Sequence, residues 1–238
     1  MIFKSCLLLI LSLAVVPLMQ AIWLRSFNPR LTLPMRNRLL HYKRTGKAGG
    51  HVKFNWVSLE EVPPVLLRCF CAAEDPKFFM HHGFDFDSIR LAIREARRSR
   101  KRPRGASTIT MQCARSVFLW HKRSWFRKGL EAYYTICIEM TLSKRRIMEV
   151  YANVIEFGEG IYGVQAACLH HFGVPVGQLD ECQSIRLVWL LPSPRKRVPR
   201  MLKVASPRFK QIALLSKNVE LPWQAGRRKV LDVTRNVL

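Results

Sequence analysis

A run of twenty residues without a charged side chain, residues 5–24, most constrains how this 238-residue chain folds. At about 1.5 Å per residue, a helix of that length crosses the roughly 30 Å apolar core of a bilayer. Lys4 and Arg25 bracket the run, and Trp23 is typical of a membrane interface. No A-x-A cleavage site follows, so the run predicts an uncleaved membrane anchor, with a cleaved signal peptide as the main alternative.

The charge of the chain is extreme, +24 from 40 Lys and Arg against 16 Asp and Glu. Such a balance indicates a partner rich in negative charge: nucleic acid, an anionic membrane surface or a phosphorylated substrate. The basic residues between Arg90 and Arg104 are consistent either with a solvated helix face or with contacts to phosphate. The apolar run and the scarcity of aromatic–basic repeats argue against nucleic acid. A hydrophobic content of 49% excludes a disordered chain.

The pattern along the chain predicts a mostly α domain. A basic connector, residues 25–41, follows the anchor; a single domain covers residues 42–215, and a basic tail covers residues 216–238. A helix is expected to open at Pro63-Pro64 and to end at Glu74 or Asp75, because Pro76 follows. Another helix is expected after Asp87 as an N-cap. Two more helices are expected over residues 128–142 and, after Ser143, over residues 144–153.

The seven cysteines do not form a pair of C-x-x-C units, so a structural zinc site is not expected. Their surroundings favour small core hydrophobes. Adjacent histidines at 81–82 and 170–171 do not face one site on a helix, so metal binding by them is not predicted.

Five short strings carry the strongest functional signal. They are Glu74–Gly83 (EDPKFFMHHG), Arg104–Arg115 (RGASTITMQCAR), Arg127–Glu131 (RKGLE), Lys144–Asn153 (KRRIMEVYAN) and Gly160–Gly163 (GIYG), the last followed by Ala166-Ala167 and Phe172-Gly173. In this order they resemble the signatures of the peptidoglycan glycosyltransferases, the family shared by monofunctional transglycosylases and the N-terminal domains of bifunctional penicillin-binding proteins. The resemblance covers roughly residues 42–215. Because a penicillin-binding transpeptidase domain does not fit after Leu215, the chain looks like the monofunctional, membrane-anchored type.

The resemblance implies an α-helical, lysozyme-like fold and a polymerising reaction on lipid II. The 4-hydroxyl of an acceptor sugar attacks the anomeric carbon of a donor glycan and displaces undecaprenyl diphosphate with inversion. A sugar hydroxyl needs a base, and a diphosphate leaving group needs charge neutralisation. Glu74 matches the family's catalytic base; independently, its position at a helix end beside Asp75 raises its proton affinity. Glu131 matches the second catalytic glutamate, which assists at the diphosphate through a divalent cation, Mg²⁺ or Mn²⁺, with no organic cofactor.

Further positions match substrate-binding residues of the family. They are Asp75, Phe78, His82, Gly83, Ser107, Thr108, Gln112, Arg115, Arg127, Lys128 and Lys144. From the residues alone, an i,i+4 salt bridge explains Arg127 and Glu131 equally well, and helix capping explains Ser107 and Thr108.

The chain departs from the family pattern at Ala106, Met111, Arg115 and Ser116, where the usual residues are Gly, Gln, Lys and Asn. These departures leave both glutamates in place. They keep open a non-catalytic scaffold as one alternative; a lytic, glycan-cleaving enzyme of lysozyme-like fold is another.

The implied partners are lipid II and the growing glycan strand, anionic membrane lipids and other cell-wall synthesis proteins, without nucleic acid. The substrate sugars of the family lie outside the cytoplasm, so we expect a single-pass protein of the bacterial inner membrane with a periplasmic catalytic domain. Counted naively, the basic residues after the anchor favour the opposite orientation, and the charge count leaves the topology open.

Overall fold

The computed structural model describes residues 15–46, 50–99, 106–120, 122 and 124–224. Residues 5–14 of the predicted anchor, 100–104 of the basic run and 225–238 of the predicted tail lie outside the described residues. Residues 15–26 are helical. Within the described ranges, no helix is both long and apolar enough to cross a membrane.

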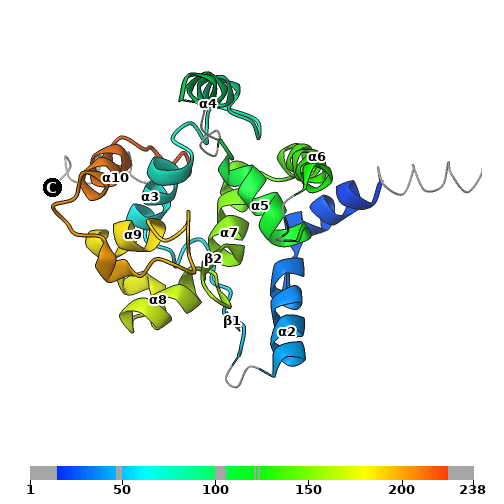
Figure 1. Ribbon diagram of the computed structural model, residues 1–238, viewed down its shortest axis with the longest axis horizontal. Helices are drawn as coiled ribbons and strands as arrows, with labels where there is room; N and C mark the ends of the chain where they lie inside the picture. Colours follow the sequence, from blue (N-terminus) through cyan, green and yellow to red (C-terminus); the bar gives the residue numbers. More distant parts are fainter. Residues whose placement is uncertain (1–14, 47–49, 100–105, 121, 123, 225–238) are drawn as a thin grey trace, which may run out of the picture.

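The prediction of a mostly α domain is confirmed, and a small sheet accompanies the helices (Figure 1). The helices are α2 (Leu33–Thr45), α3 (Pro64–Glu74), α4 (Phe86–Ser99), α5 (Ile109–Phe118), α6 (Trp125–Thr141), α7 (Lys144–Val154), α8 (Val164–Phe172), α9 (Glu181–Val188) and α10 (Pro207–Lys217), with short 3₁₀ helices at Val176–Gln178 and Pro199–Met201.

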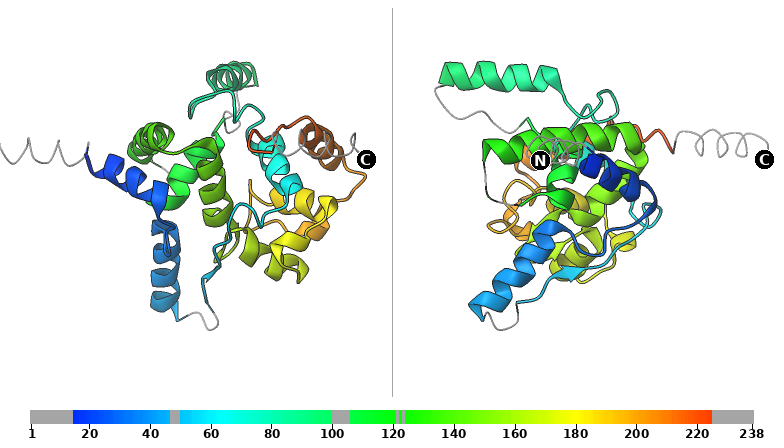
Figure 2. Two further views of the ribbon diagram at one scale, coloured as in Figure 1. Left: turned by 180° about the vertical axis from the view of Figure 1, so that it is seen from behind. Right: turned by 90° about the vertical axis from the view of Figure 1, so that its right-hand side faces the viewer.

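Two groups of helices build the domain, α3 with α9 and α10, and α5 with α6 and α7. Figures 1 and 2 show them on opposite sides of the molecule. Phe70 of α3 meets Tyr151 of α7 edge-on at a ring-centroid distance of 5.4 Å, and both side chains are fully buried. Aromatic pairs of this geometry add to the burial of their apolar area, so this contact helps to join the two groups.

The sheet has three short strands in the order β1-β3-β2: β1 (Lys53–Phe54), β3 (Ile161–Tyr162) and β2 (Glu156–Gly158). β1 runs parallel to β3, and β2 runs antiparallel to it. Beside the sheet, the buried amide of Asn153 accepts a hydrogen bond from Val57 N and donates one to Val57 O, both at 2.9 Å. This side chain therefore fastens the end of α7 to the segment that follows β1.

Two of the predicted helix ends are confirmed and two differ from the prediction. α3 ends at Glu74 and α7 begins after Ser143, whose Oγ accepts from Arg146 N, as expected. α6 begins at Trp125, earlier than predicted, because Ser124 Oγ accepts from Arg127 N. The predicted N-cap Asp87 is wrong.

Asp85 fills that position, since its Oδ1 accepts from Ser88 N at 3.0 Å, while Asp87 pairs with Lys77. The predicted connector, residues 25–41, contains most of the helix α2. This helix begins with Pro34 in its first turn and ends at Gly46, whose φ of 59° is the left-handed conformation that favours glycine.

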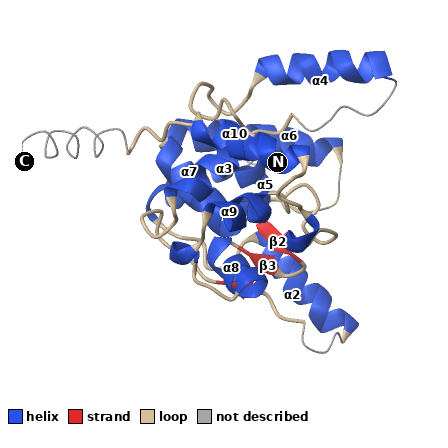
Figure 3. Ribbon diagram, turned by 90° about the vertical axis from the view of Figure 1, so that its left-hand side faces the viewer, coloured by secondary structure: helices blue, strands red, loops and turns tan. Residues whose placement is uncertain are grey.

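α4 lies apart from the rest of the domain (Figure 3). None of the described side chains of α4 is buried, and its arginines are exposed to solvent.

Most of the cysteines, in contrast, lie in the core. Cys69, Cys71, Cys113, Cys137 and Cys168 are buried and unpaired, and Cys182 is partly buried. Their predicted role as core hydrophobes agrees with this placement.

Candidate active site

Glu74 lies where the two helix groups meet. It is the last residue of α3, and its Oε2 accepts a hydrogen bond of 2.8 Å from Nε2 of Gln112 on α5. The hydroxyl of the fully buried Tyr151 on α7 donates to Gln112 Oε1 at 3.3 Å. Three helices thereby orient one carboxylate, which is half-buried.

Burial is the largest influence on this carboxylate and raises the pKa of Glu74 above its usual value. The hydrogen bond from Gln112 and the charges of Arg208, Arg115 and Arg197 act in the opposite direction. A carboxyl with a raised pKa holds a proton more strongly than an exposed one, so Glu74 has the property that a general base requires.

Glu131 lies on α6, is completely buried, and is surrounded by cations. Arg127 Nη1 donates to its Oε2, and Lys128 Nζ donates to its Oε1 at 2.8 Å. Arg115 Nη1 of α5 lies 3.6 Å from the same Oε1. Three positive charges around one negative charge leave a net positive cluster, which we call the cation cluster: Arg115, Arg127, Lys128 and Glu131.

The cation cluster retains donors for a ligand. The side chains of Arg115 and Lys128 are 33% and 40% exposed, so both remain accessible. Nε of Arg127 is buried and has no hydrogen-bond partner within the described part of the chain. Since guanidinium and ammonium groups bind phosphate oxygens, the cluster suits a phosphorylated ligand.

Arg115 connects the two glutamates. It contacts Glu131 directly, and its charge also acts on Glu74. Ser107 lies between them as well, because its Oγ is 3.5 Å from Lys128 Nζ and its carbonyl accepts from Gln112 Nε2 at 3.4 Å. The structure therefore brings together seven of the predicted residues: Glu74, Ser107, Gln112, Arg115, Arg127, Lys128 and Glu131.

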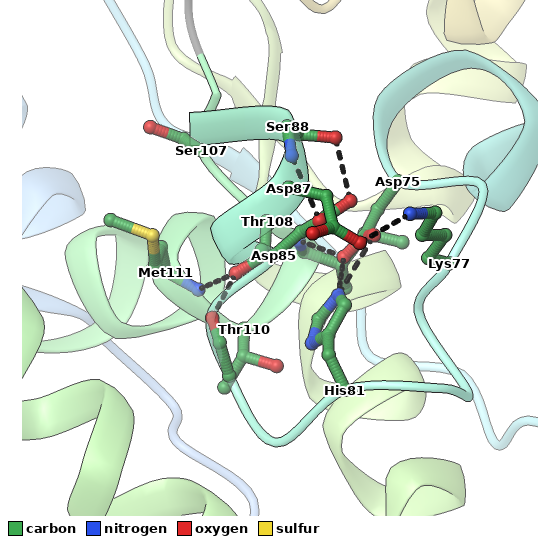
Figure 4. Close-up of polar contacts among 12 residues, drawn as sticks. Asp75, Lys77, His81, Asp85, Asp87, Ser88, Ser107, Thr108, Thr110 and Met111 are labelled. Atoms are coloured by element: carbon green, nitrogen blue, oxygen red, sulfur yellow. Dashed lines mark hydrogen bonds and ion pairs between the residues drawn. The ribbon is translucent and has the colours of Figure 1, made fainter. Parts of the chain in front are cut away.

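Asp75 has a different environment (Figure 4). Its buried carboxylate contacts Nε2 of His81 at 2.9 Å and accepts a hydrogen bond of 3.0 Å from Ile109 N, the first residue of α5. Both bonds lie within the protein, and they join the end of α3 to the start of α5. Asp75 thus holds in place the two helices that carry Glu74 and Gln112.

Thr108 and Gly83 form a second local connection. Thr108 caps α5 by accepting from Met111 N, and its hydroxyl donates to the carbonyl of Gly83 at 2.6 Å. Gly83 has φ 90°, and a Cβ there would lie 2.7 Å from Cγ2 of Thr135 on α6. Glycine is required here because the loop approaches α6 so closely.

Lys144 lies in a separate cluster. Its Nζ donates to Glu139 Oε1 at 2.8 Å and sits 4.6 Å from the ring centroid of Phe78, which is fully buried. Thr110 also donates to Glu139 Oε1. His82, in contrast, is exposed. Substrate contacts by these predicted residues stay predictions.

Sequence reasoning missed Tyr151, His81, Glu139 and Arg208 as members of the site or its support. In the sequence, Tyr151 is only one residue of the string Lys144–Asn153, and His81 is only one of two adjacent histidines. The partners of Tyr151 and Arg208 lie 39 and 135 residues away in the sequence, so no local pattern indicates these two contacts.

The side chains around Glu131 do not favour the expected divalent cation. The carboxylate oxygens of Glu131 are engaged by three cations, which repel a metal ion. Within the described ranges, no group of three or more His, Cys, Asp or Glu is arranged to hold a metal. The residues present at this position therefore do not fit a metal ion.

A half-buried carboxylate with a raised pKa beside a net positive cluster suits a group-transfer enzyme with an anionic leaving group. The comparisons agree with this class. A family model described as Transglycosylase matches residues 42–216. The chain belongs to this transglycosylase family.

Curated relatives carry the name "Biosynthetic peptidoglycan transglycosylase". The protein from Xanthomonas campestris pv. campestris (strain B100) is 45% identical over 183 residues, covering 77% of this chain and 74% of the relative. The protein from Xylella fastidiosa (strain 9a5c) is 41% identical over 194 residues, covering 82% and 79%. The protein from Bdellovibrio bacteriovorus is 51% identical over 142 residues, covering 60% and 56%.

Proposed function

We propose that this chain polymerises lipid II into peptidoglycan glycan strands, with Glu74 as the general base and the cation cluster as the site for the donor's diphosphate. The enzyme is a peptidoglycan glycosyltransferase, as its family membership and its named relatives support. The observation that carries the mechanism is Arg115, which acts on both glutamates and so links a proton acceptor to an anion site.

In the proposed reaction, the 4-hydroxyl oxygen of the acceptor forms a bond to the anomeric carbon of the donor. The hydroxyl proton passes to a carboxylate oxygen of Glu74, and the bond from the anomeric carbon to the diphosphate oxygen breaks. Undecaprenyl diphosphate leaves with the bonding electron pair. A single displacement of this kind inverts the anomeric carbon.

Gln112 and Tyr151 orient the base. The amide of Gln112 donates to Glu74 Oε2, which leaves Oε1 to receive the proton. Tyr151 fixes the amide by donating to its oxygen. A base with a defined orientation keeps the reacting atoms close to the geometry of attack.

The cation cluster stabilises the leaving group. Charge grows on the diphosphate as its bond to carbon breaks, and preorganised donors at that position lower the barrier. Arg115 and Lys128 are accessible and supply these donors. Glu131 positions them, because its buried carboxylate contacts all three cationic side chains.

The enzyme works in the cell envelope, where peptidoglycan is built. We further propose a single-pass anchor over residues 5–24 in the inner membrane, with the catalytic domain in the periplasm and in contact with anionic lipids and other cell-wall synthesis proteins. The uncharged run supports this, as does the helical conformation of residues 15–26. A periplasm-specific reporter fused after Leu238 should be active, and activity of a cytoplasmic reporter alone would contradict the topology.

The function is tested with purified protein and lipid II. Polymer bands on a gel are expected from the unmodified protein and not from Glu74→Gln. Release of muropeptides from intact sacculi would instead indicate a lytic enzyme, which has no use for the cation cluster. A well-folded protein without either activity, under conditions where a relative polymerises, would indicate a scaffold.

A further inference from the structure

Residues 218–224 follow α10 and pack onto the domain. Leu221 is 4% exposed and belongs to the core, and Gln224 N donates to its carbonyl at 2.9 Å, which closes a turn that contains Trp223. Trp223 is partly buried and packs against the same core. The match to the transglycosylase model covers residues 42–216, so this segment lies beyond it. A role for the segment in the reaction follows from its contacts alone.

Trp223 contacts the loop that follows Glu74. Its ring meets the ring of Phe79 edge-on at a centroid distance of 5.6 Å, and Phe79 meets Phe78 edge-on at 5.0 Å. Phe78 is fully buried and Phe79 is partly buried. Such pairs are favourable because the positive edge of one ring lies against the negative face of the other. Three rings in a row therefore attach this loop to the segment after α10.

The same loop sets the end of α3. Phe78 N donates to the carbonyl of Asp75 at 3.0 Å, and Met80 N donates to the carbonyl of Lys77 at 2.8 Å. Asp75 is the C-cap of α3 and directly follows Glu74. A displacement of Phe78 thus acts on the backbone one residue from the Glu74 side chain.

We infer that Trp223 is a positioning residue for Glu74. By holding Phe79, its ring fixes the loop Asp75–Gly83, and with it the orientation of the carboxylate at the end of α3. The inference rests on the proposed function, in which Glu74 is the general base. A displacement of about 1 Å at a reacting group costs about 10²-fold in rate, so one ring contact outside the site governs kcat.

The test compares Trp223→Ala with Trp120→Ala in the full-length protein. Trp120 is also partly buried, and it stacks on Phe126 at a centroid distance of 6.4 Å, but it follows the end of α5 opposite to Gln112. Initial rates of lipid II polymerisation give kcat and KM. We expect Trp223→Ala to lower kcat by about tenfold or more, with KM within about twofold, because the donors for the diphosphate lie on α5 and α6. Trp120→Ala should keep kcat.

Hydrogen exchange supplies a readout that does not depend on activity. The amide of Phe78, which is bonded to Asp75 O, should exchange about tenfold faster in Trp223→Ala and at the original rate in Trp120→Ala. Trp223→Phe keeps a ring against Phe79 and should restore most of kcat and the slow exchange. Trp223→Leu fills much of the same space and takes the place of Trp223→Ala if that variant does not fold.

Several results would overturn the inference. They are an unchanged kcat in a folded Trp223→Ala or Trp223→Leu protein, even with faster exchange at Phe78, an equal loss of kcat in Trp120→Ala, and a loss that Trp223→Phe does not restore. Full activity of Glu74→Gln would instead contradict the proposed function. A low kcat with fast exchange in Trp223→Ala would then still support Trp223 as the residue that positions this loop.

Discussion

Arg208 of α10 donates a hydrogen bond of 3.2 Å from Nη2 to the carbonyl oxygen of Ala73. Ala73 precedes Glu74, the proposed general base, so a residue from α10 places a positive charge beside the end of α3. The charge lowers the pKa of Glu74 and partly offsets the effect of burial. Arg115 from α5 and Arg197 act on Glu74 in the same direction.

Replacing Arg208 with Gln should shift the pH dependence of catalysis. A general base is active when deprotonated, so activity rises with pH through the pKa of Glu74. Loss of one cation raises that pKa further, and the acidic limb of kcat/KM should move to higher pH, with a plateau within about twofold of the original. Arg208→Lys keeps the charge and should leave the limb nearly in place. An unshifted limb in Arg208→Gln would show that this arginine is only structural.

Glu74→Gln keeps the shape of the side chain but cannot accept a proton. Polymerisation of lipid II should fall by about 10²-fold or more, as expected for loss of a general base. The measurement is the initial rate of polymer formation on a gel. Full activity in this variant would remove Glu74 from the mechanism.

The same substitution should affect stability in a pH-dependent way. The pKa of Glu74 is raised in the folded state, so the stability associated with its protonated form is present at low pH and lost as pH rises through the folded pKa. Gln has no such loss. The Tm of Glu74→Gln minus that of the unmodified protein should therefore increase from about pH 4 to pH 8, measured by calorimetry. A constant difference would mean that burial does not penalise the charged carboxylate.

Arg115→Ala should weaken the use of the donor without altering the fold. A hydrogen bond to a charged group contributes about 1.5–3 kcal/mol, which predicts a loss of roughly tenfold to a hundredfold in kcat/KM. Arg127→Ala should cause a similar loss and also lower Tm, because its side chain is buried beside Glu131. Arg97→Ala is the control, since Arg97 is exposed on α4. A loss in Arg97→Ala alone would place the phosphate site on α4.

Asn153→Ala should destabilise the domain. The substitution leaves Val57 N and Val57 O without their side-chain partners, at a cost of about 1–3 kcal/mol for each buried group that stays unpaired. The decrease is measured as a lower midpoint of urea denaturation with an unchanged m-value. Asn55→Ala, at an exposed position, should have little effect. Equal midpoints for the two variants would show that water replaces the amide of Asn153.

Residues in contiguous signatures could be predicted from the sequence, whereas contacts between distant residues could not. Glu74, Arg115, Arg127 and Glu131 were identified because their signatures are short and contiguous. The role of Asp75 in joining α3 to α5 could not be predicted from the sequence. Its partner Ile109 is 34 residues away and contributes a backbone N–H, which every residue but proline has.

Helix positions show the same limit. Apolar periodicity located α3, α4, α6 and α7, but the start of α6 was placed too late. Trp125 and Phe126 are 92% and 69% exposed, so these apolar residues do not follow the buried face of the helix. Arg208 lies 135 residues from Ala73, and only the packing of α10 on α3 brings them together.

The buried cysteines have a consequence for an enzyme of the cell envelope. Burial raises the pKa of the Cys69, Cys113 and Cys168 thiols to about 12. The thiolate is the form that attacks a disulfide or an oxidant, and at neutral pH these three groups hold almost none of it. An oxidising compartment favours cross-linking between accessible thiols. Their placement in the core makes these cysteines unreactive in such exchange, so an oxidising compartment would not drive mispaired bridges through them.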